Sequence, residues 1–533
     1  MQQLSGLDAV FLHLESANMP MHIGSLAIYD PSTAPDGHVG FKDILAYFAQ
    51  RLHKARSFRQ RLARVPLSAD HPFWVEDPDF DLEYHVRHIA LPKPGDWRQL
   101  CIQTARLHSR PLDMERPLWE ATVIEGLDNV DGVPPGSFAL VTKFHHAAVD
   151  GVSATEIAAA FHDVAADAFA EPPAKPWKPD RLPGDLELLG RAAMSTVRKP
   201  LEMASFAAKS APKLLRAGSA ALRGEASWKV RVPRTRFNET VSSHRVFDAR
   251  QYPLDAIKAI KSTVEGATVN DVVVSVCGGA LREYLHSKGE LPKESLVAMA
   301  PVSARSQDQR GTAGNRISTL SLPIRTDVAD PYERLKAVHE ESQRAKKMSG
   351  SLGGDIVADI AHFLPSMSSG LMAHAYGRWD MARRLPPVFN TVITNVPGPG
   401  FPLYSMGSQL VANYGLGPVA HGVGLFQPVL SYNGNVTISA VSCREIMPDP
   451  AFYCECLDNA FAELGRAVKS KAKSTGKAAQ TPSVKPMSRA RARAAERKRK
   501  AALTKAESEG TVEKKKTSRK KRAVSKKAPD KKT

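Results

Sequence analysis

The sequence is poor in cysteine, and the few cysteines that it has do not form a recognisable pattern. An odd number of scattered cysteines does not make a disulfide framework. The last two form only a C-x-C, without a second pair at the spacing of a zinc site. We therefore expect free thiols and a reducing compartment. The five are Cys101, Cys277, Cys443, Cys454 and Cys456.

Long apolar runs and targeting signals are also missing. No run approaches 18 uninterrupted apolar residues, which argues against a membrane-spanning helix. The opening MQQLSGLDAVFLHLESANMPMH lacks the basic start and the cleavage site of a signal peptide. Between Leu385 and Cys443 there is no Asp, Glu, Lys or Arg, and Gly and Pro interrupt the stretch repeatedly. That pattern predicts buried strands and tight turns, either as an ordinary sheet core or as the wall of an apolar channel.

The formal net charge of +18 is confined to one end of the chain. Residues 469–533 hold 24 basic and 5 acidic residues and no Phe, Tyr or Trp, so the remaining chain has a net charge of −1. This Lys/Arg/Ala-rich tail is predicted to be disordered. It could bind nucleic acid by neutralising phosphates, or anionic lipid headgroups, and we favour lipid.

The chain divides into four parts. Residues 1–170 are predicted to form one α/β domain and 235–468 a second of similar size, although no internal sequence repeat is visible. Between them, 171–234 combines a Pro-rich linker with a basic amphipathic segment at 185–224, which suits either a membrane surface or a crossover helix with a solvated face. Expected strands and helices of the second domain are, respectively, 295–301, 317–324, 389–395 and 435–441, and 255–264, 270–286 and 331–346.

The heptapeptide HHAAVDG lies between a predicted strand, 138–145, and a predicted helix, 153–166, that begins with a Ser153/Glu156 capping box. Such junctions hold side chains rigidly and often bear chemistry. A neutral imidazole of His145 or His146 can accept a proton at cellular pH, with a carboxylate such as Asp150 to orient it. Gly151 permits a sharp turn. A metal site lacks an evident third ligand, whereas a purely structural histidine pair remains open on spacing alone.

Six motifs, in the family's order, resemble those of the bacterial wax ester synthase/diacylglycerol acyltransferase family. Besides HHAAVDG and the opening LSGLDAVFLHLESANMPMHIG, they are Pro117–Trp119 (PLW), Asn270–Asp271 within ATVNDVVVSV, Pro301–Arg305 (PVSAR) followed by Gly314–Asn315, and Asn395–Pro399 (NVPGP). The similarity covers about residues 1–465. That family belongs to the CoA-dependent acyltransferase superfamily, together with chloramphenicol acetyltransferase and the condensation domains of peptide synthetases.

The resemblance implies two pseudo-duplicated chloramphenicol-acetyltransferase-like α/β domains, with the active site in a channel between them. It makes His146 the base that takes a proton from an acceptor hydroxyl, which then attacks an acyl-CoA thioester directly. No acyl-enzyme forms, in agreement with the absence of a G-x-S-x-G motif. Asn270 is the candidate oxyanion donor by chemical type. Asp150 is expected to hold the loop, with Arg305 as one candidate partner, and His145 to support His146 or to pack.

Structural explanations compete for the other motifs. Pro117 fixes a turn and Trp119 packs. Thr268 can cap a helix with Asp271 reaching back, which competes with a substrate-binding role for Asp271. The segment 395–399 suits a rigid channel wall.

We therefore expect an acyl-CoA-dependent O-acyltransferase that esterifies diacylglycerol to triacylglycerol. The alternatives are a wax ester synthase that uses a long-chain fatty alcohol and a lipid-binding member of the fold without activity. The expected partners are long-chain acyl-CoA, as substrate, and one of these acceptors, and neither a metal nor a bound cofactor is implied. We expect a cytoplasmic protein at the inner membrane face or on lipid inclusions.

Overall fold

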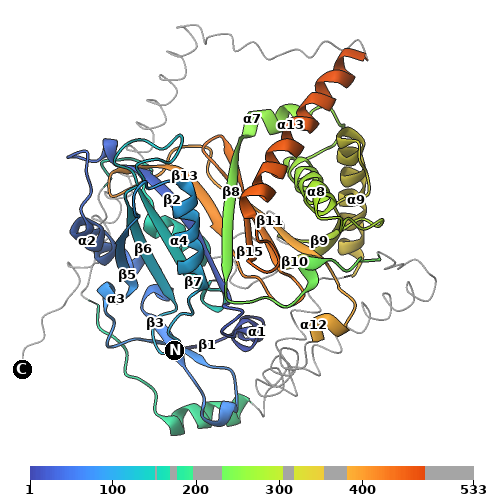
Figure 1. Ribbon diagram of the computed structural model, residues 1–533. Coiled ribbons are helices and arrows are strands. Elements are labelled where there is room, and N and C mark those ends of the chain that lie inside the picture. The colour runs from blue at the N-terminus through green and yellow to red at the C-terminus, as the bar shows by residue number, and fades with distance from the viewer. Residues whose placement is uncertain (150–152, 169–176, 196–230, 304–316, 353–380, 475–533) are drawn as a thin grey trace, which may run out of the picture. The chain divides into compact units, whose positions relative to one another are not determined.

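A computed structural model of the chain describes residues 1–149, 153–168, 177–195, 231–303, 317–352 and 381–474 (Figure 1). Residues Met1–Lys469 form one compact unit, in which two six-stranded sheets provide the framework. The predicted mixed α/β fold is confirmed. Most of the basic tail lies outside the described residues, but helix α13, Pro450–Ser474, continues past Lys469 into the segment predicted to be disordered.

The first sheet has the strand order β12-β13-β2-β7-β6-β5. All neighbours are antiparallel except β5 and β6, which are parallel. Every residue of the central β7 is buried, as expected for a strand covered on both faces. The bounds are β2 His22–Asp30, β5 Val86–Ala90, β6 Trp119–Glu125, β7 Phe138–His145, β12 Tyr404–Ser405 and β13 Ser408–Leu416.

Two strands of this first sheet come from the second half of the chain. β13 pairs antiparallel with β2, from Gln409 opposite Asp30 to Leu416 opposite Gly24, with an irregularity between Leu410 and Ala412. Residues 404–416, which the sequence places in the domain 235–468, thus complete the sheet of the other domain. The two halves of the chain are therefore joined by the backbone hydrogen bonds between β13 and β2.

The second sheet has the order β10-β9-β11-β14-β15-β8. Four of its strands were predicted, and the structure places them within two residues of the expected bounds. The charge-free run 385–443 contains β11, β13, β14 and β15, so the prediction of buried strands there is confirmed. The bounds are β8 Arg245–Pro253, β9 Val297–Ser303, β10 Ile317–Pro323, β11 Thr391–Pro397, β14 Leu425–Tyr432 and β15 Asn435–Cys443.

Helices link and cover the sheets (Figure 1). The α8 helix lies so close to its neighbours that a Cβ on Gly279 would stand 2.9 Å from the Cβ of Ala460 in α13. Trp97 of α4 donates its indole N–H to Asp248 of β8 at 2.8 Å, which ties the first half to the second. The bounds are α1 Gly6–Leu14, α2 Phe41–Arg51, α3 Leu82–His85, α4 Trp97–Ser109, α5 Ser153–Phe161, α7 Leu254–Lys261, α8 Val269–Ser287, α9 Pro331–Leu352 and α12 Met381–Arg384.

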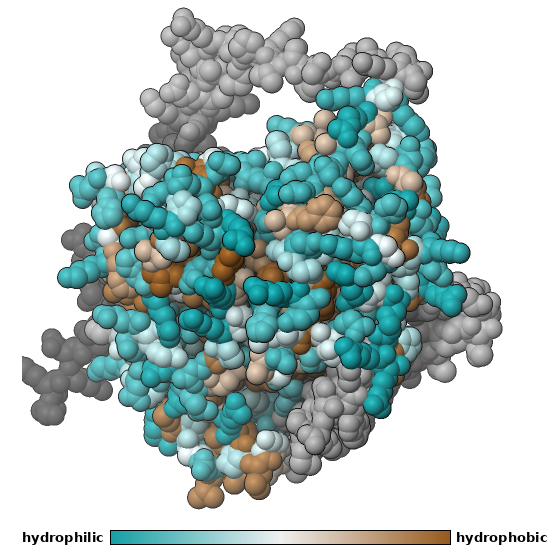
Figure 2. Space-filling model, in the orientation of Figure 1, coloured by the Kyte–Doolittle hydropathy of each residue, from teal (hydrophilic) through white to brown (hydrophobic). Residues whose placement is uncertain are grey.

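A small third sheet consists of β1 (Gln2–Gln3), β4 (Phe73–Glu76) and β3 (Gln60–Ala63). Part of the predicted linker packs beside it. Residues 185–195 are helical and bury Leu188 and Ala192 against Val65 and Phe73. The same helix exposes Leu186. Figure 2 shows apolar residues gathered at the bottom of the molecule, where Figure 1 places this helix. The rest of the predicted segment 185–224 lies outside the described residues.

Candidate active site

The two histidines of HHAAVDG stand at the end of β7, where main-chain hydrogen bonds hold both. The His145 N–H donates to the carbonyl of Leu118 at 3.0 Å, and the His146 N–H donates to that of Met21 at 2.8 Å. The next residues form a short 3₁₀ helix, η5, His146–Ala148. The strand predicted to lead into the motif is therefore confirmed, and the PLW segment touches the motif through Leu118.

The ring of His145 is fully buried and fixed on both sides. Its Nδ1 accepts the N–H of Ala147 at 3.1 Å. In the neutral ring the proton must then be on Nε2, which donates to the carboxylate of Glu15. His145 thus supports the turn that begins with His146.

Glu15 bridges two histidines from neighbouring strands. Its other oxygen lies 3.5 Å from Nε2 of His22, which faces His145 across the β2–β7 ladder. Burial pushes the pKa of Glu15 upward, but the contacts with His145 and His22 outweigh burial and lower that pKa to about 2. The carboxylate of Glu15 is thus held ionised beside His145, the first of the two histidines of HHAAVDG (the HH pair).

The buried chain continues to His108 of α4. Nδ1 of His22 faces the carbonyl of His108 at 3.5 Å, and Nε2 of His108 donates to the carbonyl of Gly417 at 3.1 Å. Burial, followed by the charge of His22, lowers the pKa of His108 to about 3, so its ring is neutral. Gly417 directly follows β13, so the strand that the second half of the chain adds to the first sheet also supports this cluster.

His146 differs from these histidines because its ring is only half-buried. One face stacks on Phe11 of α1, with ring centroids 3.8 Å apart and planes 15° apart. Nδ1 is buried and makes no hydrogen bond to the described residues. Burial lowers the pKa of His146 to about 4, against a smaller raising effect of its own backbone. The ring is therefore a neutral imidazole at cellular pH.

Three further predicted residues, Asp150, Gly151 and Arg305, lie outside the described residues, so the proposed loop contact stays a prediction. Asn270 and Asp271 lie in the first turn of α8. The capping box is confirmed: Thr268 accepts the N–H of Asp271 at 3.2 Å, and the carboxylate of Asp271 accepts the N–H of Thr268 at 2.9 Å.

Asp271 is fully buried, and its capping oxygen also lies 2.9 Å from Nδ1 of His339 in α9. One oxygen of this carboxylate thus holds the helix end and contacts His339. The neighbouring Asn270 accepts a hydrogen bond at 3.3 Å from the amide of Asn395, in the NVPGP segment. The structure therefore brings two of the motifs together, but no hydrogen bond among the described residues joins this pair to His146.

Trp119 packs as predicted and is 1% exposed. Its indole N–H donates to the carbonyl of Phe58 at 2.9 Å, and His85 stacks on it. Sequence reasoning missed Phe11, Glu15, His22 and His108. The first three lie in the segment LSGLDAVFLHLESANMPMHIG, which resembles the N-terminus of the family. The motif alone does not show that these side chains meet His145 and His146.

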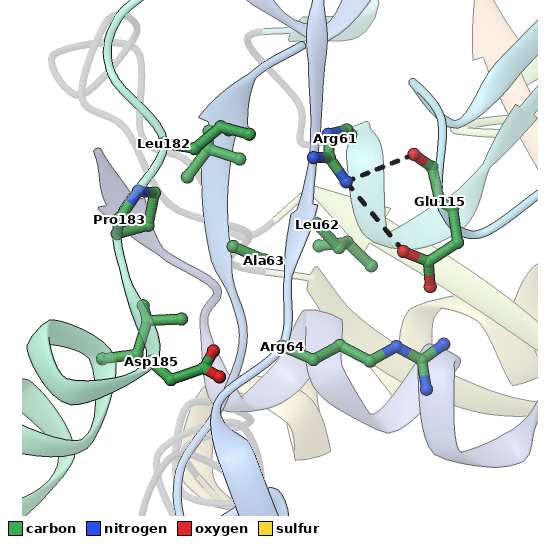
Figure 3. Close-up of a pocket in the computed structure, with 10 residues that line it drawn as sticks. Arg61, Leu62, Ala63, Arg64, Glu115, Leu182, Pro183 and Asp185 are labelled. Atoms are coloured by element: carbon green, nitrogen blue, oxygen red, sulfur yellow. Dashed lines mark hydrogen bonds and ion pairs between the residues drawn. The ribbon is translucent and has the colours of Figure 1, made fainter.

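One cavity lies beside the small third sheet, and another lies at the β5 edge of the first sheet. One, of about 270 Å³, lies between β3 and residues 182–188, where Arg61 contacts the carboxylate of Glu115 at 3.9 Å (Figure 3). The other, of about 500 Å³, lies beside β5 and the end of α4. Neither includes His146.

Within the described residues, no cluster of three or more His, Cys, Asp or Glu could hold a metal. In that same part of the chain, no helix is long and apolar enough to cross a bilayer.

Comparison with known proteins identifies the family. Residues 4–273 match the wax ester synthase/diacylglycerol acyltransferase catalytic domain, and 313–465 match the C-terminal domain of the same family. A Mycobacterium tuberculosis protein named "Putative diacyglycerol O-acyltransferase" is 34% identical over 448 residues, which cover 81% of this chain and 90% of that protein. Another protein of the same name and species is 34% identical over 473 residues and is covered completely, against 87% of this chain.

Solved structures agree. The wax ester synthase/diacylglycerol acyltransferase of Marinobacter aquaeolei is 28% identical, with a TM-score of 0.61 over 88% of this chain and 100% of that one. The starter condensation domain of rhizomide synthetase, at 15% identity and a TM-score of 0.50, covers 89% of this chain and 94% of that one and shares the fold. On these matches, the chain belongs to the wax ester synthase/diacylglycerol acyltransferase family.

Proposed function

We propose that the protein transfers an acyl group from acyl-CoA to the free hydroxyl of diacylglycerol, with His146 as general base. The observation that carries this is the contrast within the HH pair. His145 is buried and saturated with hydrogen bonds, whereas His146 is half-buried, neutral and held by its main chain. Family membership supplies the reaction class, and the relatives named as diacylglycerol O-acyltransferases favour this acceptor.

The proposed reaction needs one proton acceptor and no covalent enzyme intermediate. The acceptor oxygen attacks the thioester carbonyl carbon while its proton passes to His146. The tetrahedral intermediate then collapses, the C–S bond breaks, and the proton passes from His146 to the sulfur. The products are an ester and free CoA. Neither step consumes a metal or cofactor; acyl-CoA is a substrate.

Asn270 is the proposed oxyanion donor. Because its side-chain oxygen accepts the bond from Asn395, its own NH₂ group is directed elsewhere and can donate. Asp271 supports this role indirectly, since its cap fixes the first turn of α8. Asp150 and Gly151 are proposed to shape the loop that follows the base.

We further propose that the enzyme works at the inner membrane face or on lipid inclusions, where diacylglycerol is present. The exposed Leu186 and Met194 on the helix 185–195 support contact with an apolar surface. The basic tail then adds attraction to anionic headgroups, and nucleic-acid binding by the tail is the less favoured alternative.

An acceptor panel tests the proposal. Purified protein receives labelled palmitoyl-CoA with diacylglycerol, hexadecanol or no acceptor, and ester and free CoA are measured. We expect triacylglycerol with diacylglycerol, loss of about 10²-fold or more in His146→Ala, and unchanged rates in the control His38→Ala, an exposed histidine. Activity only with hexadecanol would instead establish a wax ester synthase. Lipid binding without ester formation would establish a member without activity.

A further inference from the structure

Helix α1 and its C-terminal cap contact both histidines of HHAAVDG, through Phe11 in the helix and Glu15 at its end. Phe11 stacks on the ring of His146, and Glu15 binds Nε2 of His145. Glu15 follows Phe11 by four residues, and residues four apart lie on the same side of a helix, so the helix and its cap present both groups on one side. Glu15 is also the C-terminal cap of α1, and its N–H donates to the carbonyl of Phe11 at 3.2 Å. The spacing of the two contacts is thus set by helix geometry.

The two contacts act on different degrees of freedom. The Glu15 bond selects the Nε2–H form of His145, which leaves Nδ1 of His145 free to accept the N–H of Ala147. That bond closes the first turn of η5, on which His146 stands. The Phe11 stack restricts rotation of the His146 ring itself. A ring whose Nδ1 has no hydrogen-bond partner among the described residues depends on such packing for its orientation.

We propose that Phe11 and Glu15 form a two-point clamp that sets the position and ring orientation of His146, with His22 as the second anchor of Glu15. They are positioning residues, because neither accepts the proton. This inference rests on the proposed function of His146. The clamp fixes the direction in which the base faces the acceptor hydroxyl, and such positioning changes the rate of the chemical step more than substrate affinity.

Steady-state kinetics separates positioning from general structural support. In Glu15→Gln the side chain keeps its size but loses its charge, and in Phe11→Leu the residue stays apolar but loses its flat face. We expect kcat to fall at least tenfold in each variant, while the KM for palmitoyl-CoA stays within twofold. A kcat within threefold of wild type in both variants, or a KM that rises while kcat is retained, would overturn the clamp.

Matched controls exist elsewhere in the chain. Phe41 of α2 also stacks on a histidine, His88, with centroids 5.0 Å apart, and Glu290 forms an exposed pair with Arg236. Phe41→Leu and Glu290→Gln should therefore leave kcat unchanged. Thermal unfolding of all variants is measured alongside, so that a fall in kcat is assigned to positioning only in a folded protein.

A second measurement does not depend on activity. In protein labelled with ¹⁵N-histidine, the Nε2 proton of His145, assigned by its loss in His145→Gln, should resonate far downfield and move upfield in Glu15→Gln. No such movement would overturn the Glu15 half of the clamp. If His146→Ala keeps normal activity while this resonance still responds to Glu15→Gln, the proposed base is wrong and the contact geometry stands.

Discussion

The carbonyl of Leu118 accepts the main-chain N–H of His145 at 3.0 Å. This bond joins the PLW segment to the first histidine of HHAAVDG at the point where β7 ends. Trp119 follows Leu118 directly and anchors it, because its ring packs among Phe48, Phe58 and Phe144 in the core of the first sheet. A packing residue thereby helps to hold the end of β7, directly before the candidate base His146.

We therefore expect Trp119→Ala to reduce both stability and activity. Loss of so large a buried side chain should cost about 3–5 kcal/mol of unfolding free energy, measured by urea unfolding. Trp119→Phe should recover much of that stability. If Trp119→Ala unfolds at the wild-type urea concentration, the packing role assigned to this residue is wrong.

Asp271 and Asn270 should respond differently to truncation, although they are neighbours. Asp271→Ala removes the cap of α8 and the contact with His339, so we expect a loss of about 1–2 kcal/mol in unfolding free energy. Asn270→Ala should leave stability nearly unchanged and lower kcat about 10²-fold, as for an oxyanion donor. Urea unfolding and steady-state kinetics on both variants check this, and a reversed pattern would contradict the assignment.

The pH dependence of the rate should reflect the burial of His146. Only the unprotonated ring can act as base, and burial lowers its pKa to about 4. We expect kcat/KM to stay level from pH 8 down to about 5 and to fall only as the pH approaches 4. Circular dichroism at each pH verifies that the protein remains folded. A midpoint near 6.5, the ordinary histidine value, would show that the base is more exposed to water than the structure has it.

Stability should fall in mild acid because of His108. Its pKa is about 3 in the folded chain and about 6.5 when unfolded, so only the unfolded chain binds the proton between these values. Unfolding free energy should therefore decrease as the pH drops below 6.5, by up to about 1.4 kcal/mol per pH unit from this group. His108→Gln, which keeps a donor for Gly417, should flatten the slope, and His38→Gln should not.

The sequence was informative where local chemistry decides the outcome. The strand before HHAAVDG, the capping box of α8 and the buried strands of the charge-free run 385–443 follow from residue patterns over short distances. The pairing of β13 with β2 could not be predicted, because it joins residues nearly 400 positions apart and buried strands have no signature for their partner. For the same reason Glu15 was overlooked, since its partners His22 and His145 meet it only in the folded chain.

Figure 1 also shows that β13 lies beside β2 although it arises from the other half of the chain. A fragment that stopped before residue 404 would leave β2 with a bare hydrogen-bonding edge, the kind of surface that recruits foreign strands and aggregates. We therefore expect fragments that separate the two halves to lose solubility, and a circular permutation that keeps β13 paired with β2 to retain it.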